Sequence, residues 1–120
     1  MQNSDNLKNK SILYVEDDSE TVEVFKLILS RFIKEIHTAS NGKEGLEMYK
    51  ELKPDIIITD IEMPIMSGLE LLNEIKKDDP NKPVVIITAF RDEAHNAKNA
   101  DAVLIKPINR LELQEILGRL

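Results

Sequence analysis

The sequence predicts a doubly wound α/β domain, in which a five-stranded parallel sheet carries helices on both faces. Four short apolar runs are rich in β-branched residues, and a fifth, weaker run accompanies them. Segments with apolar residues at helical spacing separate these runs. Because parallel neighbouring strands need a crossover connection, the alternation of the two patterns favours a parallel sheet over an antiparallel one.

The strands are expected where the apolar runs are continuous, since a strand covered on both faces has no solvent side. In chain order these segments are 11–15 (SILYV), the weaker 35–39 (EIHTA), 55–59 (DIIIT), 84–88 (VVIIT) and 102–105 (AVLI). Pro54 and Pro83 precede the third and fourth strands, as is typical of a chain entering an extended segment.

Four of the remaining segments show the apolar period of a helix. Their apolar positions are Val22, Phe25 and Leu29; Leu46, Tyr49 and Leu52; Leu69, Leu72 and Ile75; and Leu113, Ile116, Leu117 and Leu120. Ser19 is a candidate N-cap of the first helix and Asn109 of the last. Asn41-Gly42 marks the connection before the second helix.

The length and the first residues indicate one domain after a short leader. A chain of 120 residues fits a single core. Residues 1–10 (MQNSDNLKNK) are polar and lack the apolar stretch of a secretion signal, so they are expected to be a flexible leader. The domain is then expected to cover residues 11–120.

The composition excludes several classes of function. The net charge of -6 repels nucleic-acid backbones and anionic lipid, so direct nucleic-acid or membrane binding is not expected. The chain has no cysteine, which excludes disulfides, thiolate metal sites and thiol nucleophiles. This composition is compatible with a reducing cytosol, and we expect a cytoplasmic protein.

The residues after the predicted strands are the candidates for a functional site, because ligands of doubly wound sheets bind beyond the carboxyl ends of the strands. These candidates are Glu16, Asp17 and Asp18 after the first strand, Asp60 after the third, Thr88 at the fourth, and Lys106 with Pro107 after the fifth. Oxygen ligands without His or Cys suit a hard cation such as Mg2+. A hydroxyl and an ammonium group beside such a cation suit a phosphoryl group.

Each candidate also has a purely structural interpretation. Asp is common in turns and at helix N-termini, which applies to Asp17, Asp18 and Asp60. Thr88 is a β-branched strand residue, and Lys106-Pro107 is compatible with a solvated charge at the end of a strand. The functional interpretation depends on all of them falling at the same end of one parallel sheet.

Over residues 11–120 the sequence resembles the receiver domains of two-component response regulators. The residues that carry the resemblance are YVEDD at 14–18, PDIIITDIEMPIMSG at 54–68, IITA at 86–89 and KP at 106–107. The resemblance implies a flavodoxin-like order of the five strands. It also implies a cis peptide bond before Pro107.

The resemblance further implies a role for each candidate. Asp60 is expected to be the phosphoacceptor, with Thr88 and Lys106 on the phosphoryl oxygens. Mg2+ is expected to be held by Asp17, Asp18, Asp60 and the backbone carbonyl of Glu62. A sensor histidine kinase or a histidine phosphotransfer protein is the expected donor, and an unidentified protein the expected target. Such a domain catalyses only its own phosphorylation and dephosphorylation and is not otherwise an enzyme.

Two departures from the family pattern concern signalling. Val103 occupies the position, three residues before the lysine, where the family usually has an aromatic residue. The interval from Thr88 to Lys106 is shorter than the family norm by about four residues, roughly one helical turn. The fourth helix is therefore expected to be short or irregular, and its alanines offer little apolar area to anchor it.

Two other functions remain open from the sequence. One is an aspartate-nucleophile phosphohydrolase of the haloacid dehalogenase type, in which Glu62 would act as acid and base, although 120 residues leave no room for a cap domain. The other is an interaction domain whose site is vestigial. We expect His37 and His95 to be ordinary surface or packing residues, because neither has a second imidazole at metal spacing.

Overall fold

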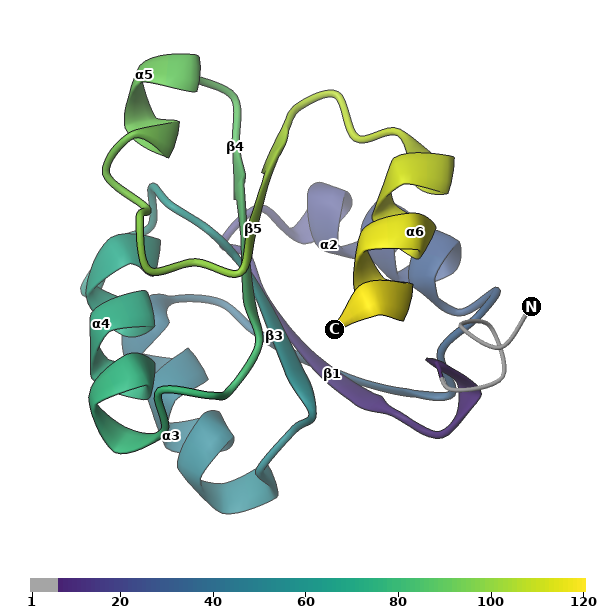
Figure 1. Ribbon diagram of the computed structural model, residues 1–120, viewed down its shortest axis with the longest axis horizontal. Helices are drawn as coiled ribbons and strands as arrows, with labels where there is room; N and C mark the ends of the chain where they lie inside the picture. Colours follow the sequence, from purple (N-terminus) through teal and green to yellow (C-terminus); the bar gives the residue numbers. More distant parts are fainter. Residues whose placement is uncertain (1–6) are drawn as a thin grey trace.

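The computed structural model describes residues 7–120, and in it five parallel strands form one sheet (Figure 1). The strand order is β2-β1-β3-β4-β5. The strands are β1 (Ser11–Val15), β2 (Glu35–Ala39), β3 (Ile56–Asp60), β4 (Val84–Thr88) and β5 (Ala102–Ile105). The helices are α2 (Ser19–Leu29), α3 (Gly42–Leu52), α4 (Gly68–Asp78), α5 (Arg91–Ala94) and α6 (Arg110–Arg119). The doubly wound prediction is confirmed.

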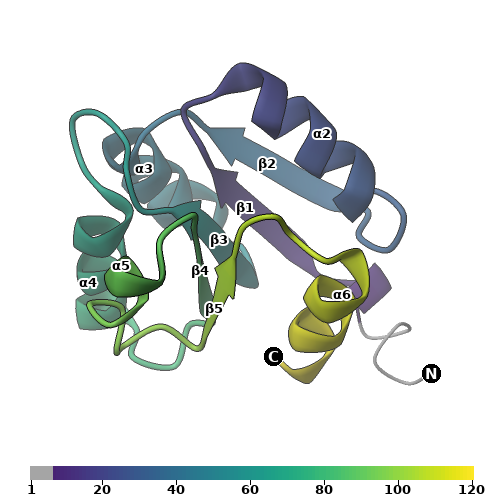
Figure 2. The same ribbon diagram turned by 90° about the horizontal axis from the view of Figure 1, so that it is seen from above.

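The helices divide between the two faces of the sheet, as Figure 2 shows from above. Successive strand residues point to opposite faces. In β1, Tyr14 packs in a cluster with Phe25 of α2 and Leu113 of α6. Its neighbour Val15 packs in a second cluster with Tyr49 of α3 and residues of α4. Each face of the sheet therefore has its own apolar core.

The ends of the helices are capped by side chains. Asp18, and not the predicted Ser19, is the N-cap of α2, because its carboxylate accepts a hydrogen bond from the Thr21 backbone N–H. Asn109 caps α6 as predicted. Ser67 and Glu70 form a reciprocal capping box at the start of α4. These caps determine where the chain leaves the sheet edge and enters each helix.

The fourth crossover is short, as predicted. α5 has only four residues, Arg91–Ala94, and none of them is buried. The chain then runs irregularly to Asp101, whose carboxylate accepts hydrogen bonds from the Val84 backbone N–H at 2.8 Å and from Lys76 Nζ at 2.8 Å. Asp101 therefore anchors the start of β5 to both β4 and α4.

The N-terminal boundary differs from the prediction. Leu7, placed by the sequence in the leader, is fully buried in the cluster beneath α2 and α6. The Lys10 backbone N–H donates to the Leu7 carbonyl oxygen at 3.0 Å and closes a turn before β1. The core therefore begins at least four residues before Ser11, because one apolar side chain in a polar segment was sufficient to dock it. The rest of the predicted leader, residues 1–6, lies outside the described part of the chain.

Two further observations concern the peptide bond before Pro107 and the length of the helices. The Lys106-Pro107 peptide bond is cis, as the resemblance implied. In the described residues, no helix combines the length and apolar content needed to cross a membrane.

Candidate functional site

The strand register brings the predicted polar residues to one edge of the sheet. Asp60 is the last residue of β3 and pairs with Ile87 of β4, so it lies beside Thr88, the next residue of β4. Thr88 in turn pairs with Ile105 of β5, which precedes Lys106. On the other side of β3, β1 ends at Val15, directly before the acidic residues.

Three carboxylates converge at this edge. Glu16, Asp17 and Asp60 each offer an oxygen, and these oxygens all lie within 4.8 Å of one another. Lys106 Nζ lies 3.3 Å from Asp60 Oδ2 and 3.7 Å from Glu16 Oε1. Three acidic side chains thus gather around one ammonium group, and their oxygens lie close enough together to hold a metal ion.

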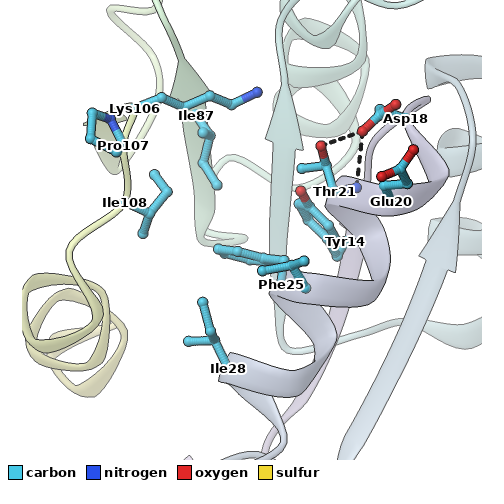
Figure 3. Close-up of a pocket in the computed structure, with 11 residues that line it drawn as sticks. Tyr14, Asp18, Glu20, Thr21, Phe25, Ile28, Ile87, Lys106, Pro107 and Ile108 are labelled. Carbon is cyan, nitrogen blue, oxygen red and sulfur yellow. Dashed lines mark hydrogen bonds between the residues drawn. The ribbon is translucent and has the colours of Figure 1, made fainter.

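Asp18 lies outside this cluster, although the sequence predicted it as a metal ligand. Figure 3 shows its carboxylate turned toward Thr21 of α2 and joined to the backbone N–H and the hydroxyl of that residue. These hydrogen bonds lower the pKa of Asp18, because they favour its charged form. The Asp18 carboxylate is thus used to cap α2, and the carboxylate that lies with Asp17 and Asp60 is that of Glu16.

Glu16 is the buried member of the cluster, with only 4% of its surface exposed. Its carboxylate accepts hydrogen bonds from the Asp18 backbone N–H at 3.2 Å and from the Tyr14 hydroxyl at 3.4 Å. Burial, followed by the negative charge of Asp60, raises the pKa of Glu16 to about 7. Burial and the charge of Glu16 also raise the pKa of Tyr14, so this phenol stays protonated and donates.

Asp60 is held by groups on both of its oxygens. Oδ1 accepts from the Ile61 backbone N–H at 2.8 Å, and Oδ2 faces Lys106. The side chain is 15% exposed, so it opens to solvent at the edge of the sheet. Asp60 is therefore held in position on both oxygens, yet reachable by an incoming group.

The loop after Asp60 is built around a close approach of the backbone. A Cβ at Gly68 would collide with the Asp60 carbonyl oxygen, so only glycine fits at this position. The Gly68 backbone N–H donates to the Ile61 carbonyl oxygen at 2.7 Å. The start of α4 is thereby closed tightly against the end of β3. Glu62, predicted to contribute its carbonyl to the metal, is exposed in this loop.

Thr88 and Lys106 are joined through the backbone. The Lys106 backbone N–H donates to the Thr88 carbonyl oxygen at 2.8 Å, which extends the β4–β5 pairing by one residue. The side chain of Lys106 then reaches back to Asp60. The Thr88 hydroxyl is engaged elsewhere, on Glu93 of α5 at 2.7 Å.

A cavity of about 540 Å³ opens beside the site, between α2 and the segment after β5 (Figure 3). Its lining is mostly apolar and includes Phe25, Ile87 and Ile108, while Lys106 and Asp18 stand at its polar side. Val24 of α2 also lines it and is 59% exposed. An apolar surface therefore adjoins the charged edge of the sheet.

A family model described as the response regulator receiver domain matches residues 12–118 of this chain. The chain belongs to this family. Receiver domains are the phosphoacceptor modules of two-component systems, and they interact with histidine kinases and with downstream targets. The family also binds Mg2+ at an acidic cluster in general.

Relatives of this receiver domain cover almost its whole length. The chemotaxis protein CheY of Thermotoga maritima is 34% identical, over 92% of this chain and 96% of that protein. The polar-differentiation response regulator DivK of Brucella anthropi is 33% identical, over 83% of this chain and 86% of that protein. Among solved structures, the response regulator TrrA of Thermotoga maritima in complex with Mg(2+)-BeF has a TM-score of 0.86 and 34% identity, over 92% of this chain and 97% of that one.

Proposed function

We propose that Asp60 is the residue of this receiver domain that accepts the phosphoryl group. The observation that carries the proposal is the position of its carboxylate, which ends a central strand, lies 3.3 Å from Lys106 Nζ and is grouped with Glu16 and Asp17. A carboxylate held in this way can attack phosphorus in line with the leaving group.

The proposed reaction exchanges one bond at phosphorus for another. An Asp60 oxygen forms a bond to phosphorus, while the bond from phosphorus to the imidazole nitrogen of a phosphohistidine breaks and its electron pair returns to the imidazole. The product is an aspartyl phosphate. Lys106 supplies a positive contact to the phosphoryl oxygens, and the Thr88 hydroxyl supplies a donor once it turns toward them.

The same residues fit a magnesium ion. Three carboxylates without His or Cys are the donor set of a hard divalent cation, and Mg2+ is usually held by one or two protein carboxylates plus water and phosphate. We propose Glu16, Asp17 and Asp60 as the residues that hold it, together with the Glu62 carbonyl that the resemblance implied. When bound, the ion neutralises charge on the phosphoryl oxygens.

The proposed partners are a sensor histidine kinase or a histidine phosphotransfer protein as donor, and a protein target whose binding depends on phosphorylation. The apolar cavity beside Lys106 and the exposed Val24 of α2 that lines it support a protein as the donor, since they offer apolar contact area next to the lysine that faces Asp60. We propose a cytoplasmic location, with which the cysteine-free composition is compatible. We also propose that the domain catalyses no reaction beyond its own phosphorylation and dephosphorylation.

The test is incubation with acetyl phosphate and Mg2+, followed by intact mass measurement. We expect the wild-type chain to gain one phosphoryl group and Asp60→Ala to gain none, while the control Asp55→Ala labels like the wild type. A label that persists in Asp60→Ala would overturn the assignment of the acceptor. Continuous release of phosphate from phosphomonoesters would favour the phosphohydrolase instead, and absence of any label would favour a vestigial site.

A further inference from the structure

The Thr88 hydroxyl at the edge of the site is engaged by a residue that the proposed chemistry does not use. Thr88 is 1% exposed, and its Oγ1 lies 2.7 Å from Oε1 of Glu93 in α5. The Phe90 backbone N–H donates to the same hydroxyl at 3.1 Å, while the Phe90 carbonyl lies farther away, at 3.4 Å. The short contact with a carboxylate identifies Glu93 as the acceptor of the hydroxyl hydrogen.

The hydrogen bond from the Thr88 hydroxyl to Glu93 excludes a second hydrogen bond from the same hydroxyl to a phosphoryl group. A threonine hydroxyl carries a single hydrogen, and it cannot donate strongly to two anions at once. If Thr88 is to donate to a phosphoryl oxygen on Asp60, its bond to Glu93 must break. A carboxylate left near the new phosphoryl group would also experience repulsion between like charges.

The same hydrogen bond is a tether of α5. None of the four residues of this helix is buried, and the helix packs against β4. In the described chain, Glu93 is the only residue of α5 whose side chain makes a hydrogen bond to another element. An element with so little buried apolar surface depends on such a tether to stay in place.

We propose that Glu93 is a positioning residue that holds the Thr88 hydroxyl away from Asp60 in the unphosphorylated protein and is displaced by the phosphoryl group. This proposal rests on the proposed function of Asp60. Phosphorylation would thereby be converted into release of residues 91–96 from β4, while the buried Ala97 stays in the core. Glu93 acts through Thr88 and has no contact with the phosphoryl group.

The test uses Mg2+ with beryllofluoride as a non-covalent substitute for the phosphoryl group, and titration followed by NMR amide shifts. Glu93→Ala removes the competing acceptor, so we expect beryllofluoride to bind about tenfold more tightly than in the wild type. Glu93→Gln keeps an acceptor oxygen and is expected to fall between the two. The matched control Asp92→Ala removes an exposed carboxylate from the same helix and is expected to leave the affinity unchanged.

A second set of measurements separates positioning from a general effect on structure. In the Thr88→Val background, which has no hydroxyl to compete for, adding Glu93→Ala should change the affinity less than twofold. Hydrogen exchange of residues 91–96 should accelerate when the wild type binds beryllofluoride, and should be fast in Glu93→Ala without it. Equal affinities of the wild type and Glu93→Ala, or a gain that persists with Thr88→Val, would overturn the proposal for Glu93.

Failure of the two proposals gives different results. If the wild type is labelled at Asp60 but Glu93→Ala binds beryllofluoride no better than the wild type, only the role of Glu93 is wrong. If the wild type neither gains a phosphoryl group nor binds beryllofluoride, the proposed function is wrong and the role of Glu93 falls with it.

Discussion

Ile65 lies in a backbone conformation that β-branched residues rarely adopt. Its φ is 72°, and the Met66 backbone N–H donates to the Pro64 carbonyl at 2.8 Å across it. This pattern is a γ-turn of the rarer, strained kind. The side chain is also 75% exposed, so it gains little from burial in return.

We therefore expect Ile65→Gly to raise the free energy of unfolding by about 1 kcal/mol, because glycine reaches positive φ without steric cost. Urea denaturation with and without the substitution measures the change. Ile65→Ala is the control: it removes the exposed side chain but keeps a Cβ, so it should recover less than half of the gain. An equal gain in both variants would show that the side chain, and not the backbone, is responsible.

Glu16 makes the stability of the metal-free protein depend on pH. Its pKa is about 7 in the folded state against an ordinary value of 4.5, so the folded chain binds this proton more tightly than the unfolded chain. The free energy of unfolding is then expected to fall as pH rises from about 4.5 to 7, by about 2 kcal/mol after allowance for solvent screening. Glu16→Gln should flatten this slope.

Denaturation in the presence of a chelator at several pH values tests this expectation. Glu20→Gln, which changes an exposed carboxylate in the first turn of α2, is the control and should keep the wild-type slope. A wild-type chain that gains stability between pH 4.5 and 7 would contradict the expected sign.

The structure groups Glu16, and not the predicted Asp18, with Asp17 and Asp60. This difference shows how far the acidic residues of the site could be predicted from the sequence. The pattern of acids after β1 correctly indicated a carboxylate site, but three consecutive acids left their roles undecided. Asp18 directly precedes the helical period, which is the N-cap position, and this signal could have assigned it to α2. The buried Glu16 faces Asp60 because of the twist and register of the strands. The spacing of residues along the sequence does not reveal these two features.

At the scale of elements, the junction of β3 and α4 leaves no room for a side chain at Gly68. Gly68 lies against the Asp60 carbonyl, and a methyl group there would collide with backbone that cannot move without moving the acceptor. We expect Gly68→Ala to destabilise the fold by about 3 kcal/mol and to slow labelling by acetyl phosphate. Gly118→Ala in α6 is the control, because alanine is favoured inside a helix.

Thermal unfolding and the labelling rate, measured on both variants, test this prediction. A Gly68→Ala variant that unfolds and labels like the wild type would show that the loop can move aside without displacing Asp60.

Most elements could be predicted from the sequence because pattern and packing agree in them. The apolar runs of β1 and β4 coincide with the observed strands, and the alanine-rich segment forms the short fourth helix that was expected, α5, with four residues. β3 is shifted by one residue, Ile56–Asp60 instead of 55–59, so Asp60 belongs to the strand. The contact between Glu93 and Thr88 could not be predicted, since it depends on how an irregular segment folds back onto β4.

At the scale of the whole molecule, the two faces of the sheet have separate cores, and Leu7 joins the N-terminal segment to one of them. It is fully buried together with residues of α2 and α6. We expect Leu7→Ala to cost about 2–4 kcal/mol, because truncation leaves a cavity in a packed core. Chemical denaturation measures this cost, and Leu111→Ala, at a side chain that is 71% exposed, is the control.

A Leu7→Ala variant as stable as the wild type would indicate that the sequence-based boundary near Ser11 is the better description of the domain. A large loss would show that any shortened chain should retain Leu7.

The anchoring of β5 by Asp101 has a practical consequence. Since Asp101, directly before the strand, is held by Val84 and Lys76, the chain can be opened between the exposed Lys98 and Asn99 without moving Lys106. The entropy of closing a longer loop grows only slowly with its length. A fluorescent reporter spliced between Lys98 and Asn99 would sit downstream of Glu93, where a biosensor for the phosphorylated state could be built into the chain.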